Sequence, residues 1–243
     1  MTRYFLELAY SGANYNGWQI QPNAPSVQQT IECSLSKLLS ESVKIVGCGR
    51  TDTGVNASYY VAHFDTELPN KVEKIGFLYH LNAILPKDIA IKSVKEVSLD
   101  MHARFSALER EYQYYICTEK NPFTTHMYQY SVPLDVEKMN HAASLLLDND
   151  DFSSFAKLHS DNSTNICSVK KACWSRDKSQ LTFTISANRF LRNMVRAITG
   201  TLIDVGKGKL TVDDFASIIE AKDNTKASSS APAQGLFLTN VKY

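Results

Sequence analysis

Two pairs of strand-like segments follow each other with only short connections, and these pairs limit the possible folds more than any other feature. The segments VKIVGCG and SYYVAHF flank a glycine-containing turn, and KKACWSRD and QLTFTISA flank a short polar turn further along the chain. Short connections suit antiparallel neighbours, because parallel strands need a long crossover. Helical patterns recur in both halves as well, so we expect an α+β fold and not a doubly wound parallel sheet.

Hydrophobic periodicity predicts the remaining elements. Strands are expected at 3–10, 89–97, 110–119 and 235–243, and helices from Ser26, over 71–84, from Asp135, over 188–205 and over 211–222. Ser26 with Gln29 three residues later has the spacing of a capping box. We place a domain boundary between 107 and 108, which gives an N-terminal half of 1–107 and a C-terminal half of 108–243.

The overall charge argues against bulk attraction to nucleic acid or membranes. The chain of 243 residues carries 26 basic and 25 acidic side chains, for a net charge of +1. A local basic patch remains compatible with this balance. The five cysteines form no CxxC pair and lack the spacing of a zinc site, so we expect reduced thiols and no bound metal. No apolar run has the length of a membrane span or a signal peptide, which predicts a cytoplasmic protein with no membrane partner.

The stretch VGCGRTDTGV, residues 46–55, has the glycine spacing of a phosphate-binding loop but not its chemistry. A Walker loop needs Lys and a hydroxyl residue after its second glycine, and Val55 and Asn56 stand there. A dinucleotide fingerprint would need a glycine at the position of Asp52, whose carboxylate would repel a pyrophosphate. We therefore expect neither nucleotide cofactor.

Asp52 itself has two interpretations from the residues alone. Aspartate often bonds its own backbone in turns, so Asp52 could serve the turn only. Alternatively, Arg50 and Asp52 lie two residues apart and would share one side of an extended segment. A carboxylate beside an arginine stays ionised at neutral pH, which a carboxylate nucleophile requires.

The motif GRTDTGV resembles the GRTDAGVHA signature of the tRNA pseudouridine synthase A family. Five further blocks resemble that family in the same order, namely 15–28, 81–89, 101–116, 190–202 and 231–243. The resemblance implies a pseudouridine synthase fold, in which two similar halves, each an antiparallel sheet with helices, frame an active-site cleft. It also implies tRNA as substrate, with uridines at positions 38 to 40 of the anticodon stem-loop as the usual targets of the family, and a homodimer.

The resemblance assigns roles to four residues. Asp52 matches the nucleophile that allows the glycosidic bond of uridine to break and the base to be reattached through C5. Arg50 matches an arginine that takes part in flipping the target base, and Tyr112 matches the tyrosine that stacks on it. Arg196 matches the arginine that pairs with the nucleophile. The reaction is an isomerisation and needs no cofactor or metal.

Taken alone, some of these residues have plainer interpretations. A tyrosine on a strand, such as Tyr112, is often a core residue. Arg189, Arg192 and Arg196 are spaced at i, i+3 and i+7, which on a helix would form either a solvated basic face or a track for phosphates. In the HARF segment, 102–105, the side chains could hold the junction between the halves or contact RNA. Trp18 is expected to be structural.

Four positions depart from the family pattern. Thr53 stands for the usual Ala, Asn56 for a His, Arg189 for a small or amide residue, and Asn16 for a His before the Gly-Trp pair. None has a catalytic role in the family, and we expect them at the rim of the site.

Two other functions are compatible with parts of the sequence. A non-catalytic tRNA-binding protein or chaperone could keep the fold without turnover, although the intact Asp52, Arg50, Tyr112 and Arg196 argue against it. A metal-dependent phosphodiesterase could use Asp52 as a ligand, but it would need a cluster of carboxylates or histidines that the sequence does not show near the motif.

Overall fold

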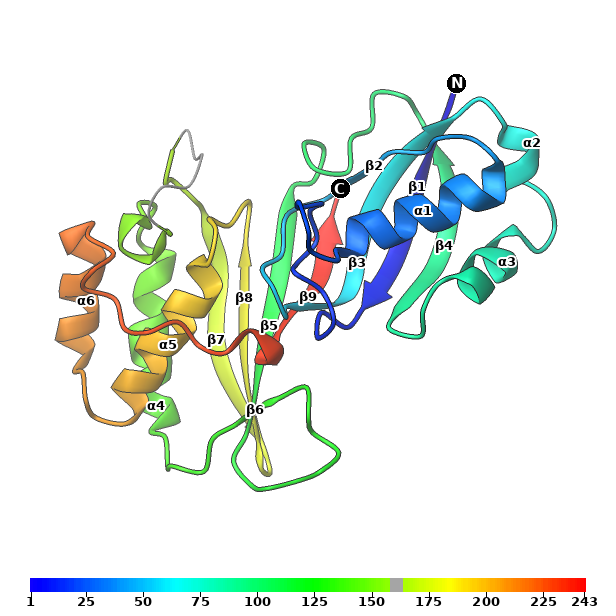
Figure 1. Cartoon of the computed structure of the whole chain (residues 1–243). Helices are drawn as coiled ribbons and strands as arrows, with labels where there is room; N and C mark the ends of the chain where they lie inside the picture. Colours follow the sequence, from blue (N-terminus) through cyan, green and yellow to red (C-terminus); the bar gives the residue numbers. More distant parts are fainter. Residues whose placement is uncertain (158–163) are drawn as a thin grey trace. The chain divides into compact units, whose positions relative to one another are not determined.

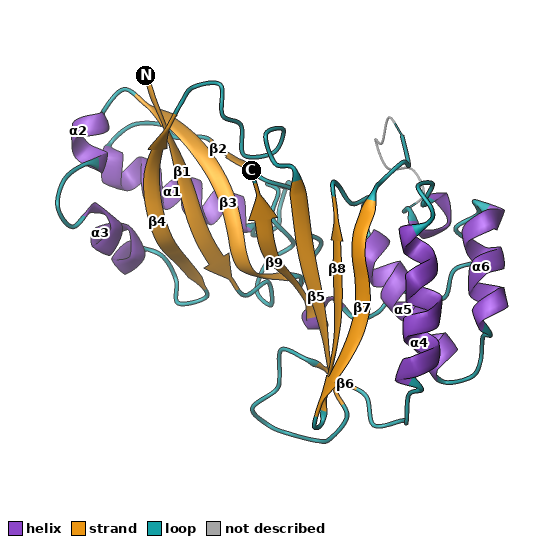
Figure 2. Cartoon of the chain, turned by 180° about the vertical axis from the view of Figure 1, so that it is seen from behind, coloured by secondary structure: helices purple, strands orange, loops and turns teal. Residues whose placement is uncertain are grey.

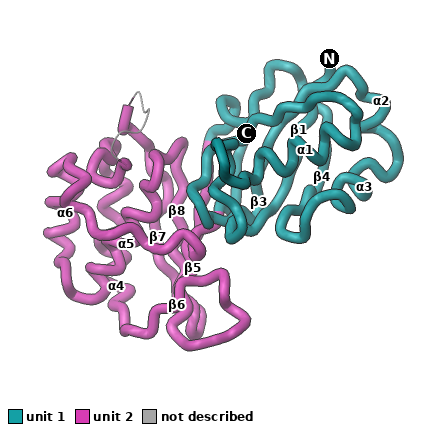
Figure 3. Tube along the Cα trace, in the orientation of Figure 1, with its two compact units in different colours: residues 1–108, 238–243 teal, residues 109–237 magenta. Residues whose placement is uncertain are grey.

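The computed structural model of the chain describes residues 1–157 and 164–243, in which strands and helices fall into two compact units (Figure 1). The first unit comprises Met1–Leu108 and Leu238–Tyr243, and the second comprises Glu109–Phe237 (Figure 3). Each unit contains a sheet of mainly antiparallel strands with helices packed against it, as Figure 2 shows by colour. The expected α+β class is confirmed.

The first unit is built on a sheet with the strand order β4-β1-β3-β9, and β2 also pairs with β3. Its elements are β1 Thr2–Tyr10, α1 Val27–Leu39, β2 Ile45–Gly47, β3 Asn56–Thr66, α2 Pro69–Val72, α3 Phe77–Ile84 and β4 Ile89–Val97. β9, Leu236–Lys242, begins in the second unit and ends in the first. β2 and β3 are antiparallel, as the first strand pair predicted.

Helix α1 lies across one face of this sheet and follows the sequence pattern closely. The Ser26 side chain accepts a hydrogen bond from the Gln29 backbone N–H at 3.2 Å, so the helix begins where the capping signal predicts. Val27, Ile31 and Leu35 are fully buried at helical spacing.

The second unit has the strand order β5-β8-β7, with the short β6 beside β5. Its elements are β5 Glu109–Cys117, β6 Tyr128–Gln129, α4 Val136–Ser144, β7 Val169–Asp177, β8 Gln180–Ala187, α5 Met194–Gly206 and α6 Val212–Ala221, with 3-10 turns at Leu145–Leu147, Ser153–Phe155 and Ala233–Gly235. β7 and β8 form the predicted hairpin, and Lys178 adopts the left-handed conformation in its turn (φ +52°).

Two helices differ from the prediction. The segment 71–84 is not one helix, because Gly76 adopts a left-handed conformation (φ +89°) between α2 and α3. The basic segment 188–205 becomes helical only at Met194, since Asn193 precedes it with φ +67°. Arg189 and Arg192 therefore lie outside α5, and the predicted basic stripe at i, i+3 and i+7 is wrong.

The end of the chain also differs from the predicted halves. The sequence placed all of 108–243 in the C-terminal half, whereas Leu238–Tyr243 belongs to the first unit. Its contacts explain this: the Tyr243 hydroxyl donates to the Ala103 carbonyl at 2.8 Å, and the Leu108 N–H donates to the Lys242 carbonyl at 2.8 Å. The Tyr243 and Phe5 rings are 5.2 Å apart between centroids.

Candidate active site

The loop that carries Asp52 stands on a cluster of three aromatic residues in the first unit. Trp18 stacks on Tyr60 with ring centroids 4.1 Å apart. The centroid of the Tyr10 ring lies 5.6 Å from that of Tyr60 and completes the cluster. The Tyr60 hydroxyl donates to the Gly49 carbonyl, and the Tyr10 and Thr51 hydroxyls share a hydrogen bond of 2.8 Å. The buried Trp18 thus has the structural role that the sequence predicted.

Backbone contacts from the segment 12–18 fix the loop on both sides of Asp52. The Trp18 N–H donates to the Thr51 carbonyl at 3.2 Å, and the Gly54 N–H donates to the Tyr15 carbonyl at 3.3 Å. Gly17 has φ +87°, and a Cβ there would lie 2.4 Å from the Thr51 oxygen. The chain therefore needs glycine at this point for the two backbones to approach.

Asp52 and Arg50 are both accessible from solvent in this hydrogen-bonded loop. Arg50 is exposed, Thr51 is buried with 9% of its surface exposed, and Asp52 is half-buried. Both charged side chains thus reach solvent, and that they lie on the same side of the loop stays a prediction. Because the Asp52 N–H and carbonyl belong to an anchored loop, its carboxylate is presented from a backbone that has little freedom.

A hollow of about 170 Å³ lies beside this loop, and sequence reasoning did not predict it. Arg50 and Gly49 line it together with Trp18 and Arg104. The Arg104 guanidinium lies 5.4 Å from the centre of the Phe105 ring. The backbone N–H groups of Arg104 and Phe105 both donate to His102 Nδ1. Two guanidinium groups at one hollow suit an anion such as a phosphate. HARF therefore contributes to the surface next to Arg50.

His63 holds the HARF segment from behind. Its Nδ1 accepts a hydrogen bond from the Ala103 N–H at 3.1 Å, which requires that nitrogen to be unprotonated, and its ring lies 4.7 Å from that of His102. Burial lowers the pKa of His63 to about 4, and the positive charges of Arg3 and His102 contribute in the same direction.

Acidification is therefore expected to destabilise the protein through His63. Between about pH 6.5 and 4 the unfolded chain binds a proton at this side chain that the folded chain does not bind, so stability falls as the pH is lowered through this window. The full pKa shift corresponds to about 3 kcal/mol. Urea unfolding of His63→Gln, which keeps an acceptor, should show a shallower pH dependence than the unchanged protein. An unaltered pH dependence would contradict the assignment, and the exposed His80→Gln serves as the control.

Tyr112 lies on β5 of the second unit, opposite Ile185 of β8. It is half-buried, and the Phe190 ring meets it edge-on with centroids 5.2 Å apart. Tyr114, two residues further on the same face, is the core tyrosine of this strand, with no exposed surface. Tyr112 thus offers a ring surface that a core residue would not.

Arg196 is fixed near the start of α5. Its Nε donates to the Ala231 carbonyl at 2.8 Å, and the Ala231 N–H donates to the Arg196 carbonyl at 2.9 Å. These bonds tie the segment before β9 to the helix, and the Tyr114 hydroxyl adds a bond of 2.8 Å to the Pro232 carbonyl. The expected pairing of Arg196 with Asp52 joins residues of different units and stays a prediction.

Comparison with known proteins decides the family. A family model described as tRNA pseudouridine synthase matches residues 8–106 and 142–243. The chain belongs to this family.

Curated tRNA pseudouridine synthase A proteins resemble it over at least nine-tenths of their length. The protein of Bacteroides thetaiotaomicron is 51% identical across 100% of this chain and 91% of its own. That of Bacillus subtilis is 40% identical across 97% of both chains, and that of Thermoanaerobacter sp. is 39% identical across 100% of both.

The departures from the synthase pattern lie in different surroundings. The sequence placed Asn56 at the rim of the site, but Asn56 is buried, with only 4% of its surface exposed. Its side-chain oxygen accepts a hydrogen bond from the Gly12 N–H at 2.9 Å. It therefore holds the aspartate loop from inside. Thr53 and Asn16 are exposed, and Arg189 donates to the Thr164 carbonyl at 3.2 Å.

Within residues 1–157 and 164–243, no three or more His, Cys, Asp or Glu side chains are grouped to hold a metal ion. None of the helices in this part of the chain is long and apolar enough to cross a membrane.

Proposed function

We propose that this synthase isomerises uridine to pseudouridine in tRNA with Asp52 as the nucleophile. The observation that carries the assignment is the loop itself: a half-buried carboxylate on a backbone anchored from both sides by the segment 12–18. A nucleophile gains from such anchoring because the reacting atoms must meet in one geometry. The GRTD motif and the family membership support the same role.

The reaction balances without any oxidant or reductant. The bond between C1′ of the ribose and N1 of uracil breaks, and a bond between C1′ and C5 forms. The proton on C5 is lost to water, and N1 gains a proton. The Asp52 carboxylate begins and ends the cycle unchanged, so its role requires only that it be ionised and reach the flipped nucleotide.

We assign substrate-binding roles to Arg50, Tyr112 and Arg196. Arg50, at the hollow shared with Arg104, takes part in flipping the target nucleotide. Tyr112 stacks on the target base, which its half-buried position supports. Arg196, fixed through its Nε by Ala231, pairs with the nucleophile.

The finer substrate and assembly follow from the same family. We propose uridines of the anticodon stem-loop as targets, a homodimer as the working form, and the cytoplasm as the location. Mapping of the modified positions, molar-mass measurement in solution and cell fractionation test these three statements separately.

The central experiment uses tRNA transcripts that carry tritium at uracil C5. Incubation with the purified protein and no added metal should release label to water, because C5 loses its hydrogen when the bond between C1′ and C5 forms. Tight tRNA binding with no release from any of several tRNAs would favour a non-catalytic binder. Metal-dependent cleavage of the tRNA strand that a chelator stops, with no release of C5 tritium, would favour the phosphodiesterase alternative over an isomerase.

Tyr112 provides a graded prediction. Tyr112→Leu should lower kcat/KM for tritium release roughly 5- to 150-fold, since base stacking on an aromatic ring contributes about 1–3 kcal/mol. Tyr112→Phe should retain most of the stacking. The exposed Tyr79→Leu is the control, and an equal loss in Tyr112→Leu and Tyr79→Leu would contradict the stacking role.

A further inference from the structure

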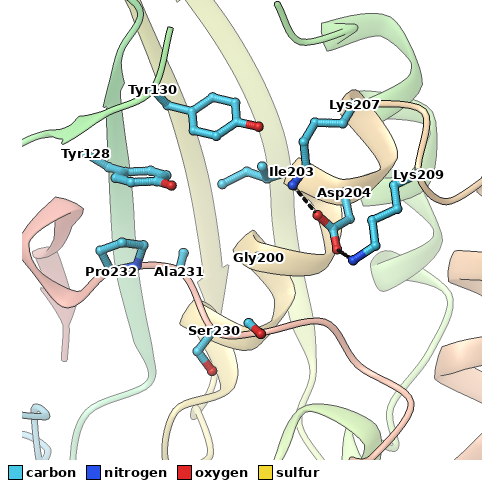
Figure 4. A pocket seen from close by; sticks show the side chains of 11 residues that line it. Tyr128, Tyr130, Gly200, Ile203, Asp204, Lys207, Lys209, Ser230, Ala231 and Pro232 are labelled. Atoms are coloured by element: carbon cyan, nitrogen blue, oxygen red, sulfur yellow. Dashed lines mark hydrogen bonds and ion pairs between the residues drawn. The ribbon is translucent and has the colours of Figure 1, made fainter. Parts of the chain in front are cut away.

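A second hollow, of about 360 Å³, lies in the second unit, between β6, the later turns of α5 and the segment 229–232 (Figure 4). One wall carries Tyr128 and Tyr130, and the opposite wall carries Asp204, Lys207 and Lys209. None of these residues belongs to the site described above.

The charged wall has an excess of positive charge. The nearly buried Asp204 carboxylate accepts from Lys207 Nζ at 2.6 Å and from Lys209 Nζ at 3.0 Å. Burial raises the pKa of Asp204, but hydrogen bonds from Lys207, Ser228 and Lys209 outweigh burial and bring the pKa below its ordinary value. One ionised carboxylate thus positions two ammonium groups, which leaves one positive charge to attract an anion.

The aromatic wall lies next to this charge. Tyr128 and Tyr130 are half-buried, and their ring centroids are 5.5 Å apart. Lys207 Nζ lies 5.9 Å from the centre of the Tyr130 ring. A ligand with an anionic group at Lys207 would therefore have its neighbouring atoms against a tyrosine ring.

The floor is formed by backbone and is already in place. Gly200 of α5 contacts the segment 229–231 so closely that a Cβ would lie 2.0 Å from the Ser229 oxygen. The hydrogen bonds between Arg196 and Ala231 hold the same segment one turn earlier. The hollow thus does not need to be opened by its ligand.

We propose that this hollow binds a nucleotide of the RNA strand, with the phosphate at Lys207 and Lys209 and the base against Tyr128 and Tyr130. Its volume is at the lower end of the range for small-ligand sites, roughly 300–1,000 Å³, which suits one nucleotide. Lysines for phosphate and tyrosines for a base are the groups that single-stranded RNA sites use. This inference rests on the proposed function.

The spacing along α5 relates the hollow to the reacting uridine. Arg196 and Lys207, the residue that caps the C-terminus of α5, are eleven positions apart, which is about 16 Å of helix. If Arg196 acts at the flipped uridine, the hollow receives a nucleotide a few positions along the strand. It would then help to select the RNA context of the target.

Two variants and one control test the hollow by tRNA binding at several salt concentrations. Lys209→Gln should weaken binding and reduce the slope of log K against log salt by about one. Its matched control is Lys138→Gln, because Lys138 is 63% exposed and pairs with one carboxylate at 3.1 Å, while Lys209 is 69% exposed and pairs at 3.0 Å. Tyr130→Leu should weaken binding about fivefold or more without changing that slope.

A tRNA that carries 4-thiouridine at single positions supplies a direct readout. Irradiation should cross-link one position near the target uridine to Tyr128 or Tyr130, and the cross-link should be lost when that nucleotide is deleted. Binding of free uridine or adenosine monophosphate to the hollow, with tRNA affinity unchanged in Lys209→Gln and Tyr130→Leu, would overturn an RNA strand as the source of the nucleotide.

The two proposals fail in different ways. Unaltered tRNA affinity and no cross-link to these tyrosines, with normal tritium release by the unchanged protein, would overturn the nucleotide hollow alone. Absence of tritium release from the unchanged protein would overturn the isomerase, whatever the hollow binds.

Discussion

Replacement of Asp52 by asparagine should abolish tritium release from C5-labelled tRNA and leave tRNA affinity within about twofold. The amide has nearly the same size, so the loop that Trp18 and Tyr15 anchor should keep its shape. It cannot act as a nucleophile, and loss of a covalent nucleophile typically costs at least about 10⁴-fold in kcat. The measurement is single-turnover release at saturating protein, with filter binding of the same tRNA.

The exposed Asp148→Asn serves as the control for this experiment, because it makes the same chemical change in the other unit. Persistent release in Asp52→Asn would place the nucleophile elsewhere. Equal loss of release and of binding would indicate that Asp52 supports only the structure of the loop.

Replacement of Gly17 by alanine should lower the free energy of unfolding by about 2–4 kcal/mol. A non-glycine residue at φ +87° costs about 1–2 kcal/mol, and the added Cβ would lie 2.4 Å from the Thr51 carbonyl oxygen, which belongs to rigid backbone. Urea unfolding measures the change. Because the clash displaces the residue next to Asp52, kcat for tritium release should fall as well.

Gly208→Ala separates the two causes of this loss. Gly208 also has a positive φ, +73°, but no atom lies within 4 Å of the position of its Cβ. Its substitution should therefore cost only the conformational strain, about 1–2 kcal/mol. If Gly17→Ala and Gly208→Ala destabilise the protein equally, the close approach of the segment 12–18 to the aspartate loop does not constrain the fold.

The sequence predicted those elements whose signals are local. Helix α1 begins at its capping serine, and the hairpin β7–β8 follows from two strand patterns and one short turn. The start of α5 was missed because the apolar periodicity continues through Asn193, although asparagine is one of the few residues that adopt the left-handed conformation readily. Gly76 is a similar sign of a helix break within the segment 71–84, because glycine adopts the left-handed conformation without steric cost.

The site divides in the same way. The aspartate loop could be predicted because its motif is contiguous, and Tyr112 and Arg196 came from resemblance to a family. The hollow at Arg50 could not, because it combines that residue with Arg104, which lies far along the chain. The hollow at Tyr130 combines β6 with the end of α5. Contacts of this kind depend on tertiary structure and leave no periodic pattern.

The path of β9 has a consequence for any truncated form of this synthase. Residues 238–243 complete the sheet of the first unit beside β3, although they follow the second unit in the sequence. A fragment that ends at residue 108, or a chain that stops before Leu238, would leave the backbone donors and acceptors along that side of β3 unpaired, and open edges of this kind promote aggregation. Loss of residues 238–243 therefore damages the first unit, which contains Asp52, although these residues follow the whole second unit in the sequence.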